Sequence, residues 1–168
     1  LKMPFVTDRW LGGMLTNFAT VRKSLKKMST IDKMVKENTA YAALAKREKL
    51  MMSREREKLE RVLGGIADLS RLPAALFVVD VKREHIAVKE AQKLGIPVFA
   101  ICDTNSNPEL VQFPIPANDD ASKSIQLIVS VMGKAIEEGL SERKVDKEDA
   151  DKKQAEEEGI QEKQNADE

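Results

Sequence analysis

Two amphipathic stretches of about twenty residues each, separated by a short reversal, constrain the fold of this chain more than any other feature. In the first, residues 14–36, apolar side chains recur at alternating steps of four and three, which is the spacing of a coiled-coil seam. The second, residues 46–63, has a similar apolar side and is followed by Gly64-Gly65, a pair typical of a glycine C-cap. Two such helices predict an antiparallel hairpin about 30 Å long. Because so narrow a seam buries little surface, the hairpin is expected to project from a body and to lean on a partner.

The reversal of the hairpin is less clearly defined than its arms. The helical pattern breaks at residues 37–39. The alanine-rich stretch 40–45 that follows fits either a helical turn or a part of the reversal itself.

An α/β body is predicted to follow the hairpin. The expected elements are a strand over 74–81, a helix over 84–94, a strand over 96–102, a short strand near 112–115 and a final helix from about 121. The first strand is a continuous apolar run, as in a parallel strand covered on both faces. Gly95 is expected to close the first helix, and Asp119 or Asp120 to cap the last one. Three strands form an incomplete parallel sheet, and the link between the second and third is too short for a helical crossover.

Charge is unevenly distributed, although the formal net charge is zero. Residues 1–30 contain six basic residues and one acidic residue, whereas residues 141–168 contain six basic and eleven acidic residues. A polyanion would therefore meet the first half of the chain rather than the tail. The tail also has almost no large apolar side chains, which predicts disorder. We thus expect an extended lead-in (1–13), a coiled-coil hairpin (14–66), an α/β body (67–140) and a disordered charged tail (141–168).

The cellular setting follows from what the sequence lacks. No apolar run approaches the length of a membrane span, and no secretory signal is present. The single cysteine excludes a disulfide framework. We therefore expect an intracellular protein with no membrane partner.

Enzymatic chemistry has little support in the residues. The loops after parallel strands are where α/β enzymes place their sites. Here those loops contain Asp80, Asp103, Thr104, Asn105, Asn118, Asp119 and Asp120. Such a group could hold Mg²⁺ and act on a phosphate, or its members could serve as turn formers and helix caps. No glycine-rich phosphate loop is present, and one histidine with one cysteine cannot form a zinc site of the usual composition. We expect no catalytic residue, cofactor or metal; a phosphate-handling enzyme with a magnesium site is the alternative.

A basic face on the first helix is a candidate for contact with nucleic acid. Arg22 stands four residues before Lys26, and Lys23 stands four residues before Lys27, so two cationic rows lie away from the seam. Like charges at this spacing repel one another, and phosphates would relieve the repulsion while releasing counterions. The alternative is a merely solvated lysine face.

The second helix has a different charge pattern. Glu57 can pair with Arg61, and Arg56 can pair with Glu60, because each pair is four residues apart. Its surface is therefore closer to a solvated or protein-binding face, on which Met51 and Met52 could meet another protein.

The segment before the first helix, residues 9–18, reads Arg-Trp-Leu-Gly-Gly-Met-Leu-Thr-Asn-Phe. The Gly12-Gly13 pair allows a sharp turn and a close approach to another surface. Arg9 beside Trp10 can contact a phosphate and stack on a base. Trp10 can equally pack in a core.

This segment resembles a motif of the bacterial small-subunit ribosomal protein two family. Further matching motifs follow in order: Glu84-His85, Ala87, Glu90-Ala91, Leu94-Gly95-Ile96-Pro97-Val98, Asp103-Thr104-Asn105 and Asn118-Asp119-Asp120-Ala121. The resemblance covers residues 5–139 and suggests roughly the last two-thirds of such a protein, without the N-terminal strands and helix that family members carry.

The resemblance implies a flavodoxin-like parallel α/β body with an inserted hairpin, and a structural rather than catalytic role in the small ribosomal subunit. It also implies binding to small-subunit ribosomal RNA, contact with other small-subunit proteins, docking of the messenger-binding protein one, and no homo-oligomer. The predicted RNA-binding residues are Arg9, Trp10, Arg22, Lys23, Lys26 and Lys27, with Lys82, Arg83 and His85 as a weaker second patch.

Overall fold

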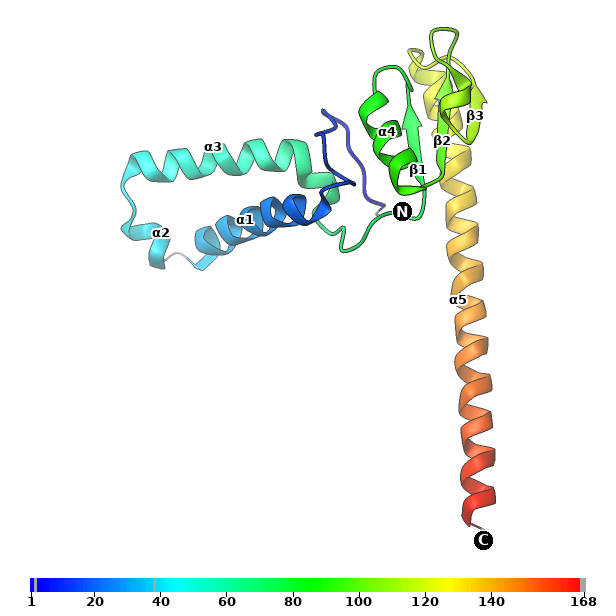
Figure 1. Cartoon of the computed structure of the whole chain (residues 1–168). Helices are drawn as coiled ribbons and strands as arrows, with labels where there is room; N and C mark the ends of the chain where they lie inside the picture. Colours follow the sequence, from blue (N-terminus) through cyan, green and yellow to red (C-terminus); the bar gives the residue numbers. More distant parts are fainter. Residues whose placement is uncertain (2, 38, 167–168) are drawn as a thin grey trace. The chain divides into compact units, whose positions relative to one another are not determined.

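The computed structural model describes residues 1, 3–37 and 39–166, and it divides into two compact units. The first unit, up to Ala121, contains the hairpin and the sheet; the second is built on the long helix that begins at Ser122. The elements, labelled in Figure 1, are α1 (Phe18–Glu37), α2 (Thr39–Ala43), α3 (Lys46–Leu63), η1 (Gly64–Ile66), β1 (Leu76–Val79), α4 (His85–Leu94), β2 (Val98–Cys102), η2 (Pro108–Leu110), β3 (Phe113–Pro116) and α5 (Ser122–Ala166).

Helices α1 and α3 lie side by side and run in opposite directions, which confirms the predicted hairpin (Figure 1). Apolar side chains from these helices and from the turns beside them form one buried cluster: Met14, Leu25, Met28, Leu63 and Ile66. Helix α3 has the bounds expected from the sequence, whereas α1 begins four residues later because residues 12–17 form turns. The short helix α2 shows that most of the alanine-rich stretch is helical. Residue 38, within the predicted break, lies outside the described residues.

The end of α3 differs from the predicted glycine cap. Gly64 has φ −57°, which is right-handed, and the chain continues into the 3₁₀ turn η1 instead of reversing in the left-handed region. Gly65 has a different role. Its carbonyl accepts the backbone N–H of Phe5 at 3.0 Å, so the lead-in lies directly against this turn.

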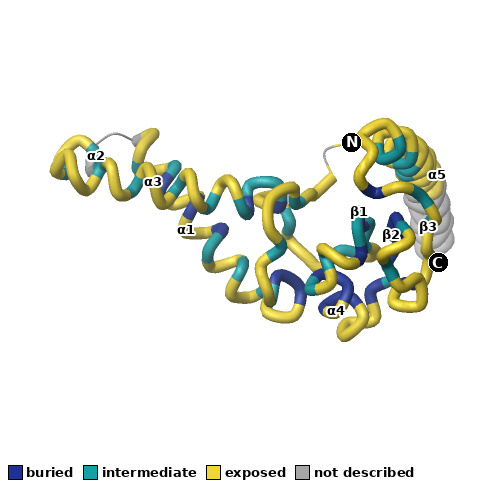
Figure 2. Tube along the Cα trace, turned by 90° about the horizontal axis from the view of Figure 1, so that it is seen from above, coloured by how far each residue is buried: buried dark blue, intermediate teal, exposed yellow. Residues whose placement is uncertain are grey.

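The three strands form a parallel sheet, as the sequence predicts, and their order in it is β1-β2-β3. Helix α4 covers one face, with Val88 and Ala91 in the same buried cluster as Val78 and Val98. The dark blue segments of Figure 2 mark this core in α4 and the strands. Gly95 ends α4 with φ +67°, which confirms the predicted cap. Only η2 occupies the link from β2 to β3, in agreement with its short length.

Helix α5 continues through residues 141–166, where the sequence predicts a disordered tail. The structure differs from the prediction here. A lack of apolar side chains argues against a packed core, but it does not argue against a helix. The same stretch is rich in glutamate, lysine, glutamine and alanine, all strong helix formers. Among the described residues, no helix is long and apolar enough to cross a membrane.

Candidate nucleic-acid interface

Three basic side chains on α1 are exposed and have no acidic partner within the described part of the chain. Arg22, Lys23 and Lys26 lie outside the seam and take part in none of the salt bridges found there. Lys27, the fourth predicted cation, instead pairs with Glu55 of α3, where the two side chains are 59% and 46% exposed. An ion pair this exposed contributes only about 0–1 kcal/mol, so Lys27 can exchange its partner at little cost.

Two cations of α3, Arg56 and Arg61, form ion pairs in the described structure. Arg56 pairs with both Asp32 of α1 and Glu60 of its own helix. The hydrogen bond to Asp32, together with the nearby carboxylates, raises the pKa of the Arg56 guanidinium. The predicted pair of Arg56 with Glu60 is thus confirmed. Arg61 pairs with Asp8 of the lead-in rather than with the predicted partner on its own helix. The two helices therefore differ in how charge is arranged: the first half of α1 has basic residues and no acidic one, whereas α3 interleaves glutamates with its cations.

One buried carboxylate, that of Glu90 on α4, binds the segment that leads into the hairpin. This segment, residues 10–16, is called the hairpin root below. Glu90 is 7% exposed and accepts five hydrogen bonds from the segment that precedes α1. The donors are the backbone N–H groups of Gly13 (2.6 Å), Leu15 (2.9 Å) and Thr16 (3.0 Å), the Thr16 hydroxyl (3.2 Å) and the Trp10 indole (3.4 Å). Gly13 has φ +90°, a value that favours glycine and turns its N–H into this cluster.

Sequence reasoning missed this role of Glu90. The one available signal is that Glu90 lies on the apolar side of its helix, next to Ala87 and Ala91. A charged residue in such a position needs several donors, because burying it without them is costly.

Burial on its own would raise the pKa of Glu90. The hydrogen bonds from the backbone of Thr16, Leu15 and Gly13 outweigh that effect and hold the pKa below its usual value. The carboxylate is therefore charged at neutral pH and stabilises the turn that starts the hairpin.

The lowered pKa of Glu90 predicts acid sensitivity of the fold. A carboxyl whose pKa is lower in the folded than in the unfolded state contributes its full stabilisation of the fold at a pH above its unfolded pKa, about 4.3. This stabilisation is lost as the pH falls through the folded pKa. We expect the free energy of unfolding in urea to fall more between pH 7 and pH 3 for the natural chain than for Glu90→Gln. Equal losses in the two proteins would contradict this assignment.

Trp10 lies where the two hydrophobic clusters meet. Its indole is half-buried and packs against both clusters: the one that contains Met14 and Leu25 in the hairpin, and the one that contains Val78 and Val98 in the sheet. The structure therefore favours packing over base stacking for this residue. Its neighbour Arg9 is exposed and remains a candidate for phosphate contact.

The weaker predicted patch is collected in one turn between β1 and α4. Lys82, Arg83 and His85 are all exposed there. Asp80 shapes the turn: it has φ +66°, and its carboxylate accepts the backbone N–H of Arg83 at 2.9 Å. The ring nitrogen Nδ1 of His85 lies 3.2 Å from the carbonyl oxygen of Lys82.

The polar residues after β2 and β3 act mainly as turn formers. Asp103 accepts the backbone N–H of Thr104 at 2.6 Å, and this bond lowers the pKa of its carboxyl. Asn118 accepts the N–H groups of Asp120 (2.9 Å) and Ala121 (2.6 Å) in the turn before α5. Both donors precede α5, so Asn118 stabilises the turn before that helix and not its first turn. Asp119 and Asp120 are the predicted caps, but among the described residues neither accepts a hydrogen bond from the first turn of α5.

Asp119 itself is 8% exposed, and its Oδ2 atom has no hydrogen-bond partner in the described structure. Burial raises the pKa of Asp119, and the nearby carboxylates of Asp80 and Asp103 add to this effect. Within residues 1, 3–37 and 39–166, no three His, Cys, Asp or Glu side chains come together in a way that could hold a metal ion. The magnesium-site alternative therefore gains no geometric support.

Comparison with known proteins agrees with the motifs. The family model described as Ribosomal protein S2 matches residues 1–139. The small ribosomal subunit protein uS2 of Cytophaga hutchinsonii is 68% identical over 157 residues, which cover 94% of this chain and 61% of that protein. The uS2 protein of Flavobacterium psychrophilum is 63% identical over 146 residues, or 87% of this chain and 54% of that protein. The chain thus spans a little more than half the length of these relatives. It belongs to the ribosomal protein S2 family.

Proposed function

We propose that this chain is a structural component of the small ribosomal subunit that binds small-subunit ribosomal RNA in the cytoplasm and catalyses no reaction. The names of its relatives support this role. The observation that carries RNA binding is the basic surface of α1: Arg22, Lys23 and Lys26 are exposed without acidic partners in the described structure, and α1 has no acidic residue before Asp32, whereas α3 interleaves glutamates with its cations.

Contacts of this kind recognise the RNA backbone rather than its bases. Arg22 and Lys26 lie one helical turn apart, about 6 Å along the axis, so the helix can meet successive phosphates of one strand. Phosphate contacts set the position and orientation of a protein on RNA, and double-stranded RNA is recognised mostly by shape. Arg9 is available for the same chemistry.

Helix α3 offers a surface for a protein neighbour. Leu50 and Met51 are 50% and 62% exposed on a helix whose surface mixes acidic and basic side chains. We propose that this side of the hairpin contacts another small-subunit protein and supports docking of the messenger-binding protein one. The chain would then act as a single copy in a mixed assembly rather than as a homo-oligomer.

RNA binding predicts a specific change in salt dependence for Lys23→Gln/Lys26→Gln. The slope of log affinity against log salt for small-subunit ribosomal RNA should become shallower by about 1.4 to 1.8, because two phosphate contacts are lost. Fluorescence anisotropy with labelled RNA between 50 and 200 mM salt measures the slope.

The matched control is Lys46→Gln/Lys58→Gln, which removes the same charge from exposed positions on α3. This control should keep the slope of the natural chain. If the slope becomes shallower by the same amount in both double variants, total charge determines binding. The proposed contact surface of Arg22, Lys23 and Lys26 on α1 is then wrong.

A further inference from the structure

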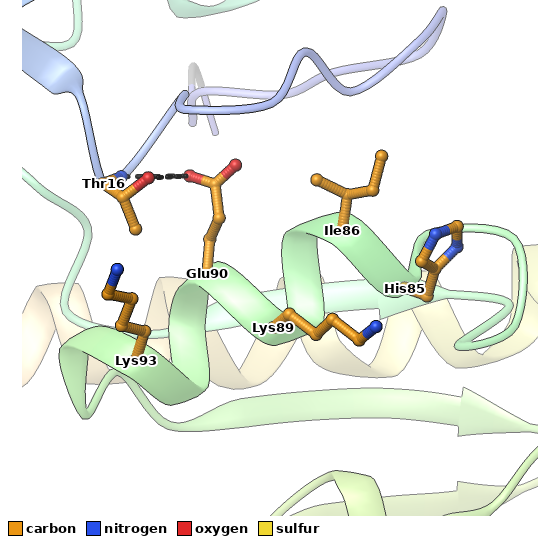
Figure 3. A pocket seen from close by; sticks show the side chains of 6 residues that line it. All are labelled: Thr16, His85, Ile86, Lys89, Glu90 and Lys93. Atoms are coloured by element: carbon orange, nitrogen blue, oxygen red, sulfur yellow. Dashed lines mark hydrogen bonds between the residues drawn. The ribbon is translucent and has the colours of Figure 1, made fainter.

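A groove of about 330 Å³ lies between the root of the hairpin and one face of α4. Figure 3 shows its lining side chains, which come from α4 except for Thr16. They are Thr16, His85, Ile86, Lys89, Glu90 and Lys93. Of these, only Ile86 is an apolar residue, and the other five bring polar or charged groups to the groove.

The negative charge in this groove is already compensated. Glu90 accepts five hydrogen bonds from the hairpin root, so its carboxylate is directed at the root and surrounded by donors. Lys89 and Lys93 have no such partner: both are exposed and neither takes part in a salt bridge of the described structure. An incoming anion would therefore meet uncompensated positive charge.

The charged residues on the solvent face of α4 are all basic. His85, Lys89 and Lys93 recur every four residues and so lie in one row along the helix. Glu90 is the only acidic residue in α4, and it is buried. Lysines at this spacing repel each other, and an anionic ligand removes that repulsion.

The length of the row distinguishes between anionic ligands. Its members are about 6 Å apart along the axis, which suits a chain of phosphates better than a single anion. The groove also opens beside Thr16, two residues before α1, the helix that carries Arg22 and Lys23. One nucleic-acid backbone could then contact both surfaces.

We propose that this groove is a second binding site for the phosphate backbone of ribosomal RNA, in which Lys89 and Lys93 are the principal contacts and His85 extends the row. The inference rests on the proposed RNA binding and adds Lys89 and Lys93 to it, beside His85 of the weaker predicted patch. The α1 face and the groove together form a two-part contact across the hairpin root.

The single tryptophan provides a local readout. The Trp10 indole donates to the Oε1 atom of Glu90, which lines the groove. We expect RNA bound in the groove to change Trp10 emission, whereas RNA held only by α1 should not. The natural chain and four double variants are titrated with small-subunit ribosomal RNA: Lys89→Gln/Lys93→Gln, Lys89→Arg/Lys93→Arg, Lys23→Gln/Lys26→Gln and the α3 control Lys46→Gln/Lys58→Gln. RNA anisotropy and Trp10 emission are followed together.

The groove variant should bind on the order of tenfold more weakly, with a salt slope shallower by about 1.4 to 1.8, and should lose the Trp10 response at saturation. The α1 variant should bind RNA more weakly but keep the Trp10 response. Lys89→Arg/Lys93→Arg, which keeps both charges, should have the salt slope of the natural chain. Circular dichroism verifies that all variants are folded. A groove variant with natural slope and affinity, beside a weakened α1 variant, overturns the groove site alone. A natural chain without affinity for the RNA overturns both proposals.

Discussion

Replacing Glu90 by leucine is expected to lower the free energy of unfolding by about 3–5 kcal/mol. The leucine would keep the volume but leave the backbone N–H groups of Gly13, Leu15 and Thr16 without their acceptor. Each buried donor left unpaired costs about 1–3 kcal/mol, and a domain of this kind has only about 5–15 kcal/mol of stability in total. Urea unfolding followed by circular dichroism and Trp10 fluorescence measures the loss.

Glu90→Gln is the informative companion to this variant. It retains one acceptor oxygen but places an NH₂ group among donors, so its loss should lie between those of the natural chain and the leucine variant. Hydrogen exchange should show the amides of Gly13 and Leu15 losing protection before those of the sheet. Unchanged protection of these two amides in the leucine variant would show that Glu90 does not hold the root.

Gly65→Ala is expected to destabilise the first unit by about 3 kcal/mol. A Cβ at this position would lie 2.2 Å from the backbone oxygen of Phe5 and 2.9 Å from its ring, and backbone cannot move aside as a flexible side chain can. The lead-in must therefore separate from η1, which breaks the hydrogen bond from Phe5 to Gly65. Urea unfolding at neutral pH, read by circular dichroism, measures the effect.

Gly12→Ala is the matched control, because a Cβ there meets nothing within 4 Å. It should change stability by less than about 0.5 kcal/mol, as surface substitutions usually do. If both alanine variants were equally stable, the close contact between the lead-in and η1 would not exist in solution.

Periodicity predicted the elements whose formation depends on their own residues. The bounds of α3, the parallel strands and the left-handed cap at Gly95 all follow from local patterns of apolar residues and glycine. The tail shows the limit of composition: lack of apolar residues excludes a core but does not exclude a helix.

The candidate interface was only partly predictable, because local spacing indicates which side chains lie away from the seam but not which distant residues they contact. Spacing indicated that Arg22, Lys23 and Lys26 lie away from the seam, and the structure exposes all three. The pairing of Lys27 with Glu55 and the role of Glu90 depend on residues far away along the chain. Glu90 lies 75 positions after its partner Leu15, and no pattern within a single helix reports such a contact.

The junction at Trp10 and Glu90 has a mechanical consequence. Helix α1 has 20 residues and is therefore a lever about 30 Å long that is clamped at one end. A tilt of roughly 6° at the clamp displaces the far tip by about 3 Å, as far as a hydrogen bond is long. The accuracy with which the tip reaches its target is thus determined at the opposite end, by one indole wedged between two cores and one carboxylate that fixes the turn.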